Sequence, residues 1–248
     1  MIKSAIHRSL RRFGIDVIRF PPREKERPPD FGKDEMEVIE TVRPWTMTSP
    51  ERIYAFMQAV RYVCAHGVAG EIVECGVWKG GSMAAAAMAL LQMKDTNREL
   101  YLFDTFEGMS APTKADVDYT GMHASDVIRQ DAGYKCADAP LEGVCEVLYR
   151  TGYPRERIHF VQGRVEETVP GQAPGKIAVL RLDTDWYEST KHELQHLFPR
   201  LARMGVIIID DYGHWRGSRK ACDEYFAENR VPILLNRIDY TGRIGLKP

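Results

Sequence analysis

The sequence predicts an α/β fold in which helices cover both faces of a mostly parallel sheet. From about residue 49 onward, short apolar runs alternate with stretches of helical periodicity, and this alternation is typical of parallel strands joined by crossover helices. The 248 residues are 44% apolar and 28% charged, as in an ordinary folded protein. Lys and Arg total 34 against 35 Asp and Glu, so we expect no chain-wide nucleic-acid surface.

The first predicted element is a helix that begins after Ser49, because Ser is a favoured N-cap and Pro50 suits the first helical position. Its apolar residues recur at helical spacing to about His66. Apolar runs then predict strands at residues 71–75, 100–104, 158–162, 177–183 and 206–211, and helices at 81–93, 141–150, 188–201 and 218–229. Residues 232–235 and 237–244 predict a C-terminal hairpin that turns near Asn236.

The N-terminal arm, residues 1–27, carries eight basic and three acidic side chains, and its apolar residues recur at helical spacing. We expect the arm to pack on its own domain or on a second subunit, which would make the protein a homo-oligomer. Contact with an anionic membrane is the alternative. Proline-rich residues 21–29 predict an extended linker. The predicted organisation is a basic extension with a linker over residues 1–43, followed by one main domain over residues 44–248.

The compartment is predicted from the cysteines and the apolar runs. The five cysteines form no C-x-x-C pair, which argues against a zinc ribbon or a small disulfide scaffold. No apolar run reaches the roughly 18 residues that span a bilayer. Residues 1–20 lack the continuous apolar region of a secretory signal. We therefore expect a cytoplasmic protein with free thiols.

Polar residues follow the first three predicted strands, at the end of a parallel sheet where ligands bind. Glu74 precedes a glycine turn that begins at Gly76, and an acidic group there suits an ammonium group. The spacing of this turn is not G-x-G-x-x-G, so a pyrophosphate site is not favoured. Asp104 could accept both ribose hydroxyls of a nucleoside, and Gln162 could read an adenine edge. The alternatives are caps for the two acids and a surface position for Gln162.

Paired acids end the next two predicted strands: Asp183 and Asp185 on one, Asp210 and Asp211 on the other. Neighbouring strands lie about 4.8 Å apart, so these carboxylates would meet and repel one another unless a cation neutralises them. Oxygen ligands without Cys or His favour a hard cation, Mg²⁺ first and Mn²⁺ or Ca²⁺ next. The alternative is that each Asp caps the following helix.

Four sequence blocks resemble those of the macrocin O-methyltransferase (TylF-type) family, whose members methylate sugar hydroxyls with S-adenosylmethionine. The blocks are ECGVWKGGS at residues 74–82, FDTFEG at 103–108, LRLDTDWYEST at 180–190 and IDDY at 209–212. The resemblance covers about residues 44–230 and implies a class I methyltransferase fold, which is Rossmann-like. Residues 44–248 are then the methyltransferase domain.

The resemblance also implies roles for individual residues. It places Glu74, Gly76, Ser82 and Asp104 at the cofactor, with Thr46 in a segment that closes over it. It implies that Mg²⁺ is held by Asp183, Asp210 and Asp211. The family usually has Gly between its paired acids, where this chain has Thr184.

The function predicted from these observations is a Mg²⁺-dependent O-methyltransferase that moves a methyl group from S-adenosylmethionine to a hydroxyl of a sugar or a glycosylated small molecule. Asp183 is the candidate base that accepts the hydroxyl proton. One alternative is a metal-dependent glycosyltransferase that uses Asp183 and Asp185 as a D-x-D motif. Another is a non-catalytic Rossmann-like binding module.

Overall fold

The computed structural model describes residues 28–130 and 139–248. The predicted helix over residues 1–27 and most of the predicted linker lie outside these residues. The chain divides into two compact units, Met1–Met36 and Glu37–Pro248. In the described part of the first unit, Phe31 N donates to Pro28 O, and a helix begins at Lys33. The second unit contains the sheet. The predicted boundary at residue 43 stays a prediction.

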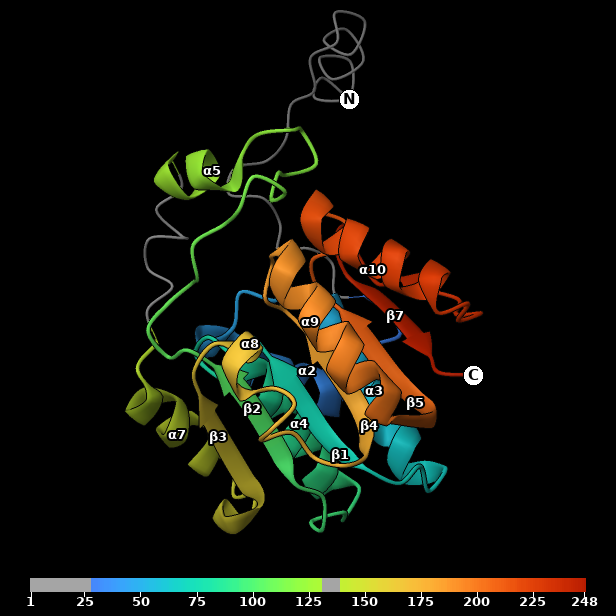
Figure 1. The fold of residues 1–248 in the computed structure, drawn as a ribbon. Helices are drawn as coiled ribbons and strands as arrows, with labels where there is room; N and C mark the ends of the chain where they lie inside the picture. The colour runs from blue at the N-terminus through green and yellow to red at the C-terminus, as the bar shows by residue number, and fades with distance from the viewer. Residues whose placement is uncertain (1–27, 131–138) are drawn as a thin grey trace, which may run out of the picture. The chain divides into compact units, whose positions relative to one another are not determined.

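The described strands form one mixed sheet in the order β3-β2-β1-β4-β5-β7-β6 (Figure 1). The first five are parallel, and β7 pairs antiparallel with both β5 and β6. Strand order reverses between β1 and β4, which is the switch point where such sheets bind ligands. The strands are β1 (Glu71–Cys75), β2 (Leu100–Asp104), β3 (Ile158–Gln162), β4 (Ile177–Leu182), β5 (Leu201–Ile209), β6 (Asn236–Arg237) and β7 (Arg243–Leu246).

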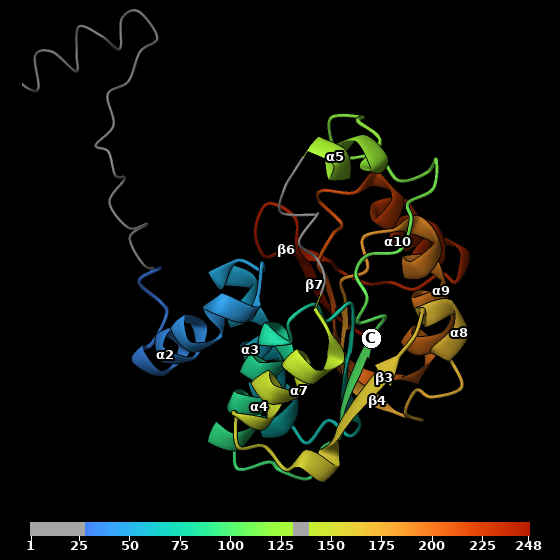
Figure 2. The same ribbon diagram turned by 90° about the vertical axis from the view of Figure 1, so that its left-hand side faces the viewer.

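Helices cover both faces of this sheet, as predicted (Figure 2). On one face lie α3 (Pro50–Ala65), α4 (Gly81–Gln92) and α7 (Leu141–Tyr149), and on the other α8 (Val165–Thr168), α9 (Tyr187–Leu197) and α10 (Arg216–Glu228). Ser49 caps α3 as predicted, since its side chain accepts from Arg52 N at 3.2 Å and Pro50 is the first helical residue. Two further helices are α2 (Lys33–Val42) and α5 (Ala124–Gln130).

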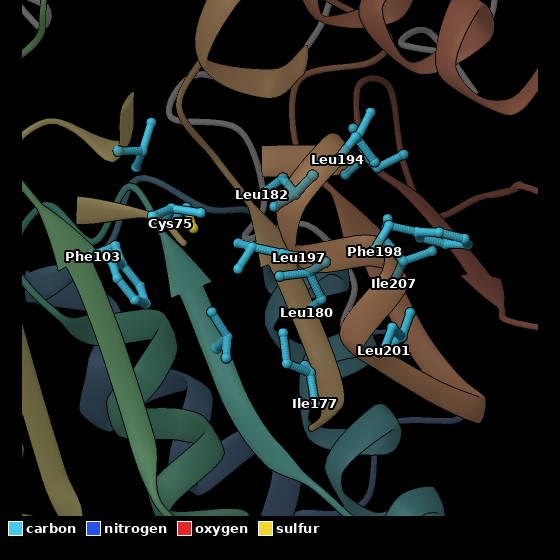
Figure 3. Close-up of a cluster of buried hydrophobic side chains, with 14 of the residues drawn as sticks. Cys75, Phe103, Ile177, Leu180, Leu182, Leu194, Leu197, Phe198, Leu201 and Ile207 are labelled. Carbon is cyan, nitrogen blue, oxygen red and sulfur yellow. The ribbon is translucent and has the colours of Figure 1, made fainter. Parts of the chain in front are cut away.

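The core on the α9 side of the sheet joins aliphatic residues of β1, β4 and β5 and Phe103 of β2 to the last turns of α9 and the following Phe198 (Figure 3). Leu180, Leu194, Leu197 and Ile207 are completely buried. Buried on both faces, β4 has no exposed position along its length. This packing fixes the carboxyl ends of β1, β4 and β5 relative to one another, and those ends carry the predicted site.

Several predicted boundaries are corrected by the structure. Helix α9 ends at Leu197, not at residue 201, because Pro199 lies in a 3-10 turn and β5 follows at once. Strand β5 therefore begins five residues before the predicted start at residue 206. Residues 232–235 are not a strand, and the hairpin consists of β6 and β7. Helices α2, α5 and α8 were not predicted. No helix in the described ranges is long and apolar enough to cross a bilayer.

Candidate active site

A cavity of about 470 Å³ lies at the carboxyl ends of the parallel strands. Its lining includes residues that follow β1, β2, β3, β4 and β5, together with the segment before α3 and the turn before β7. Seven of the predicted site residues line it: Thr46, Gly76, Ser82, Asp104, Asp183, Asp210 and Asp211. Glu74 and Gln162 do not. The sheet thus brings most of the predicted residues to one place.

The glycine turn after β1 allows the backbone to pass close to β4. Gly76 has a φ of +81°, which favours glycine, and a Cβ there would overlap the carbonyl group of Asp183. Gly76 N also donates to Phe103 O at 2.9 Å, and Asp183 N donates to Cys75 O at 2.8 Å. The turn is therefore fixed between β2 and β4 by its own main chain, with its outer side facing the cavity.

Asp104 holds this turn in place from the end of β2. One carboxylate oxygen accepts from Val77 N at 2.6 Å and from Trp78 N at 3.0 Å. The other accepts from Phe106 N at 2.8 Å. Asp104 thus caps the turn, which is the alternative role that the sequence analysis gave it. The same carboxyl group also lines the cavity. Its ribose role stays a prediction.

The segment before α3 lies over the start of α4. Thr46 and Thr48 each place a hydroxyl 3.4 Å from the hydroxyl of Ser82. Gly81 lets this segment approach, because a Cβ there would sit only 2.6 Å from Trp45 O. This arrangement is consistent with the predicted segment that closes over the cofactor.

Gln162 stands at the exposed end of β3, where its amide donates to Thr105 O at 3.4 Å. The neighbouring residues Gly163, Arg164 and Val165 line the cavity instead. The predicted contact between Gln162 and adenine stays a prediction.

Glu74 is completely buried and is paired with an arginine that the sequence analysis did not single out. Its Oε1 accepts from Arg181 Nη1 at 2.5 Å, while Oε2 has no hydrogen-bond partner among the described residues. Burial raises the pKa of Glu74 to about 7, although the positive charge of Arg181 acts to lower it. Because Glu74 lies behind the cavity wall, the predicted contact with an ammonium group stays a prediction.

Arg181 on β4 is 1% exposed and joins four groups at the switch point. Besides Glu74, its guanidinium group contacts Asp183 at 2.8 Å, Asp210 at 2.5 Å and the Thr48 hydroxyl at 3.0 Å. Burial acts to lower the pKa of Arg181, but Asp183 and Glu74 outweigh it and raise the pKa. A permanently charged group thus links β1, β5 and the segment before α3.

A second arginine, Arg52 on α3, pairs with the other oxygen of Asp210. It also contacts Asp239, from the turn before β7, at 3.0 Å. Both oxygens of Asp210 are therefore occupied by guanidinium groups. The sequence analysis expected a bound cation to neutralise the acids, and the structure shows that two arginines already do part of this.

Asp183, Asp210 and Asp211 each offer a carboxylate oxygen within 4.8 Å of the others. Asp211 accepts from Asp185 N at 3.1 Å, and burial followed by the charge of Asp183 raises the pKa of Asp211 to about 7. Burial also raises the pKa of Asp183, against the attraction of Arg181. Removal from water raises the pKa of a carboxyl group by itself, and burial is the largest cause of both shifts.

The donor set at this cluster fits a hard divalent cation. Its ligand atoms are all carboxylate oxygens, which Mg²⁺ prefers. Five acids lie at the ends of β1, β4 and β5, and two guanidinium groups face them. A dication would balance most of the remaining charge. The five acids are Glu74, Asp183, Asp185, Asp210 and Asp211.

Aromatic side chains form a further part of the cavity wall, next to the acids. Trp186 and Trp215 are nearly completely buried and pack edge to face, with ring centroids 5.1 Å apart. Trp215 Nε1 donates to Asp185 Oδ1 at 2.7 Å, which turns that carboxyl group toward the tryptophan. His214 and Tyr240 also line this part. Trp186, His214 and Trp215 stand close to the predicted acids in the sequence, so a place near the site could be expected for them, whereas the position of Tyr240 depends on the fold.

The sheet is Rossmann-like, and its cavity lies at the switch point of the strand order. A glycine turn follows β1, and acids stand at the ends of β2, β4 and β5. Together these features define a class I S-adenosylmethionine-dependent O-methyltransferase. The chain belongs to the macrocin O-methyltransferase (TylF) family, which it matches over residues 7–244.

Individual relatives agree with this assignment. The chain is 36% identical to 8-demethyl-8-(2,3-dimethoxy-alpha-L-rhamnosyl)-tetracenomycin-C 4'-O-methyltransferase of Streptomyces olivaceus, over 79% of this chain and 73% of the relative. It is 30% identical to mycinamicin III 3''-O-methyltransferase of Micromonospora griseorubida, over 79% and 76%. Among solved structures, the O-methyltransferase NovP is 28% identical, with a TM-score of 0.71 over 82% of both chains.

Proposed function

We propose that this enzyme methylates a hydroxyl of a sugar attached to a small molecule, and that it uses Mg²⁺ held by Asp183, Asp210 and Asp211. The observation that carries the proposal is the convergence of these three carboxylates in the cavity beside the glycine turn. The relatives from Streptomyces and Micromonospora support the sugar acceptor through the glycosylated molecules in their names.

The cofactor would lie along the β1, β2 and β3 ends of the cavity. Gly76 would let the main chain approach it, Asp104 would accept from its ribose hydroxyls, and Thr46 and Ser82 would meet above it. Gln162 would read the edge of its adenine from the end of β3, next to Gly163, which lines the cavity. Glu74 does not line the cavity, so its proposed contact with the ammonium group would require that group to reach the unpartnered oxygen Oε2. When bound, S-adenosylmethionine supplies an electrophilic methyl group and Mg²⁺ a Lewis acid that lowers the pKa of a hydroxyl.

Asp183 is the base in this proposal. Its side chain is 26% exposed and lines the cavity, so its carboxylate can reach a hydroxyl bound there. Asp183 would take the proton of the sugar hydroxyl, and bound S-adenosylmethionine would supply the methyl group that this oxygen accepts. Arg181 fixes the Asp183 carboxylate from behind, at 2.8 Å.

The experiment that tests the proposal is a transfer assay with S-adenosylmethionine and rhamnosides, run with Mg²⁺ and then with chelator. Methylated sugar that forms only with the metal supports it. Transfer that is insensitive to chelator would remove the metal from the proposal. The glycosyltransferase alternative is not supported, because the chain belongs to a methyltransferase family and Trp215 holds the Asp185 carboxyl group of the D-x-D motif.

Asp104→Ala is expected to weaken binding of S-adenosylhomocysteine by about 2–4 kcal/mol, because one or two charge-assisted bonds to the ribose would be lost. Calorimetric titration of the folded variant measures this change. The thermal midpoint must be measured beside it, since Asp104 also holds the turn at Val77 and Trp78. Unchanged affinity in a folded variant would show that Asp104 is only a cap.

The N-terminal arm is expected to serve assembly rather than chemistry. The full chain should therefore elute as a homo-oligomer in light scattering, and a chain without residues 1–27 should change its mass while methyl transfer persists. A truncated chain that keeps its mass but no longer binds anionic vesicles would favour the membrane alternative.

A further inference from the structure

Three aromatic rings form a cluster at the rim of the cavity. The ring centroids of Tyr119, His214 and Tyr240 lie 5.6 to 5.8 Å from one another. His214 and Tyr240 line the cavity, whereas Tyr119 extends the cluster outward. The tyrosines are 55% and 54% exposed, which is unusual for two large side chains that pack together. We call these three residues the aromatic platform.

The exposed position of Tyr119 is built into its loop. The carboxylate of Asp118 accepts from the main-chain nitrogens of Thr120, Gly121 and Met122, at 2.8 to 2.9 Å. Asp118 also forms an isolated bridge with Trp215. A turn with this many bonds holds its main chain in one conformation. The main chain thus presents Tyr119, and the contacts of its ring with His214 and Tyr240 position the side chain.

The other two rings are tied to the acids of the site. Gly213 N donates to Thr241 O at 2.8 Å, and the Thr241 hydroxyl donates to Asp210 O at 2.7 Å. A Cβ on Gly213 would overlap Tyr240 O, so glycine permits this close approach. His214 N donates to Asp211 O at 3.0 Å. The aromatic platform thus stands beside the carboxylates that face the reacting hydroxyl.

The platform combines aromatic faces with one polar atom. His214 Nδ1 shares a hydrogen bond with the Tyr240 hydroxyl, and its buried Nε2 has no partner in the described part of the chain. The platform therefore offers aromatic faces and one polar atom that is open to a ligand.

The position of the platform suits a second ring of the acceptor. Tyr240 and His214 line the same cavity as the carboxylates of the site, so a group attached to a sugar beside those carboxylates could reach the platform. From these observations we infer that the aromatic platform is an acceptor subsite, which packs against an aromatic ring joined to the methylated sugar. The inference rests on the proposed function.

The test compares p-nitrophenyl α-L-rhamnopyranoside with methyl α-L-rhamnopyranoside, which share a sugar and differ in the attached ring. Binding of each to the protein loaded with S-adenosylhomocysteine and Mg²⁺ is measured by calorimetry. The nitrophenyl compound should bind about two- to tenfold more tightly, as one aromatic contact provides. Tyr119→Ala and Tyr240→Ala should each reduce this preference, and Tyr119→Phe should keep it.

Tyr62→Ala is the matched control, because Tyr62 stacks on His66 at the end of α3 and does not line the cavity. It should keep the preference. Equal binding of the two rhamnosides to the unaltered protein would overturn the subsite, as would a preference that survives both alanine changes. Tight binding without methyl transfer to either compound would instead overturn the proposed function. Binding of neither compound would overturn both.

Discussion

Replacing Asp183 by Asn is expected to lower the rate of methyl transfer by about 10²–10⁴-fold, the usual contribution of a general base. The amide keeps the shape of the carboxyl group but cannot accept the proton at neutral pH. Because Asp183 is also one of the three proposed metal ligands, the loss should lie near or beyond the upper end of that range. Steady-state transfer to a rhamnoside at saturating cofactor measures it.

The fold should survive this change, because Asp183 is partly exposed and Arg181 keeps Glu74 and Asp210 as partners. Binding of S-adenosylhomocysteine should therefore persist. Asp126→Asn is a suitable control, since Asp126 pairs with Arg129 on the surface of α5, away from the cavity. Chelator should reproduce the loss in the unaltered protein, and Mg²⁺ should reverse it. A normal rate in both Asp183→Asn and chelator would show that the carboxylates serve only the structure.

The parallel strands could be predicted well because their apolar runs have sharp ends. Residues 71–75, 100–104 and 158–162 were predicted as strands and form β1, β2 and β3 with the same bounds. The end of helix α9 and the start of strand β5 were harder to predict, because residues 198–206 contain both a proline turn and the first residues of the strand. No break in the apolar pattern marks where the turn ends and the strand begins. The short helices α5 and α8 carry too few turns for a periodic signal.

The acids of the site could be predicted for the same reason as the strands. An Asp that follows an apolar strand lies at the carboxyl end of the sheet, whichever strands neighbour it. The arginines could not be predicted in this way. Arg52 lies on a helix, and its contacts with Asp210 and Asp239 join residues more than 150 positions apart. Such pairs appear only when strand order and helix placement are known.

Arg181 shows the same limit most clearly, since it interrupts the apolar run of β4. The role of Arg181 depends on β1 and β5 lying on either side of β4, because this order places Glu74 and Asp210 each 2.5 Å from its guanidinium group. The sequence analysis treated the acids as a group that needs a metal. The structure adds the guanidinium group of Arg181, which neutralises part of the negative charge of these acids permanently. The proposed Mg²⁺ would neutralise part of the rest.

Arg181→Met is expected to destabilise the fold by about 3–5 kcal/mol, because it leaves the buried Glu74 without a cation and leaves Asp210 with Arg52 alone. Glu74 is completely buried and Asp210 nearly so, and neither can move to water. Urea unfolding at pH 7 measures the loss. The double variant Arg181→Met with Glu74→Gln should recover part of the stability, since one uncompensated charge is removed. A loss below about 1 kcal/mol, the scale of an exposed ion pair, would contradict this account.

The same variant separates the structural role of Arg181 from the proposed metal site. Without the guanidinium group, the negative charge around Asp183, Asp210 and Asp211 rises, so a divalent cation should bind more tightly. Added Mg²⁺ should then raise the thermal midpoint of Arg181→Met by more than that of the unaltered protein, because the stabilisation by a ligand of the folded state increases with its affinity. Equal shifts in the two proteins would mean that the cation and the arginine do not share these carboxylates.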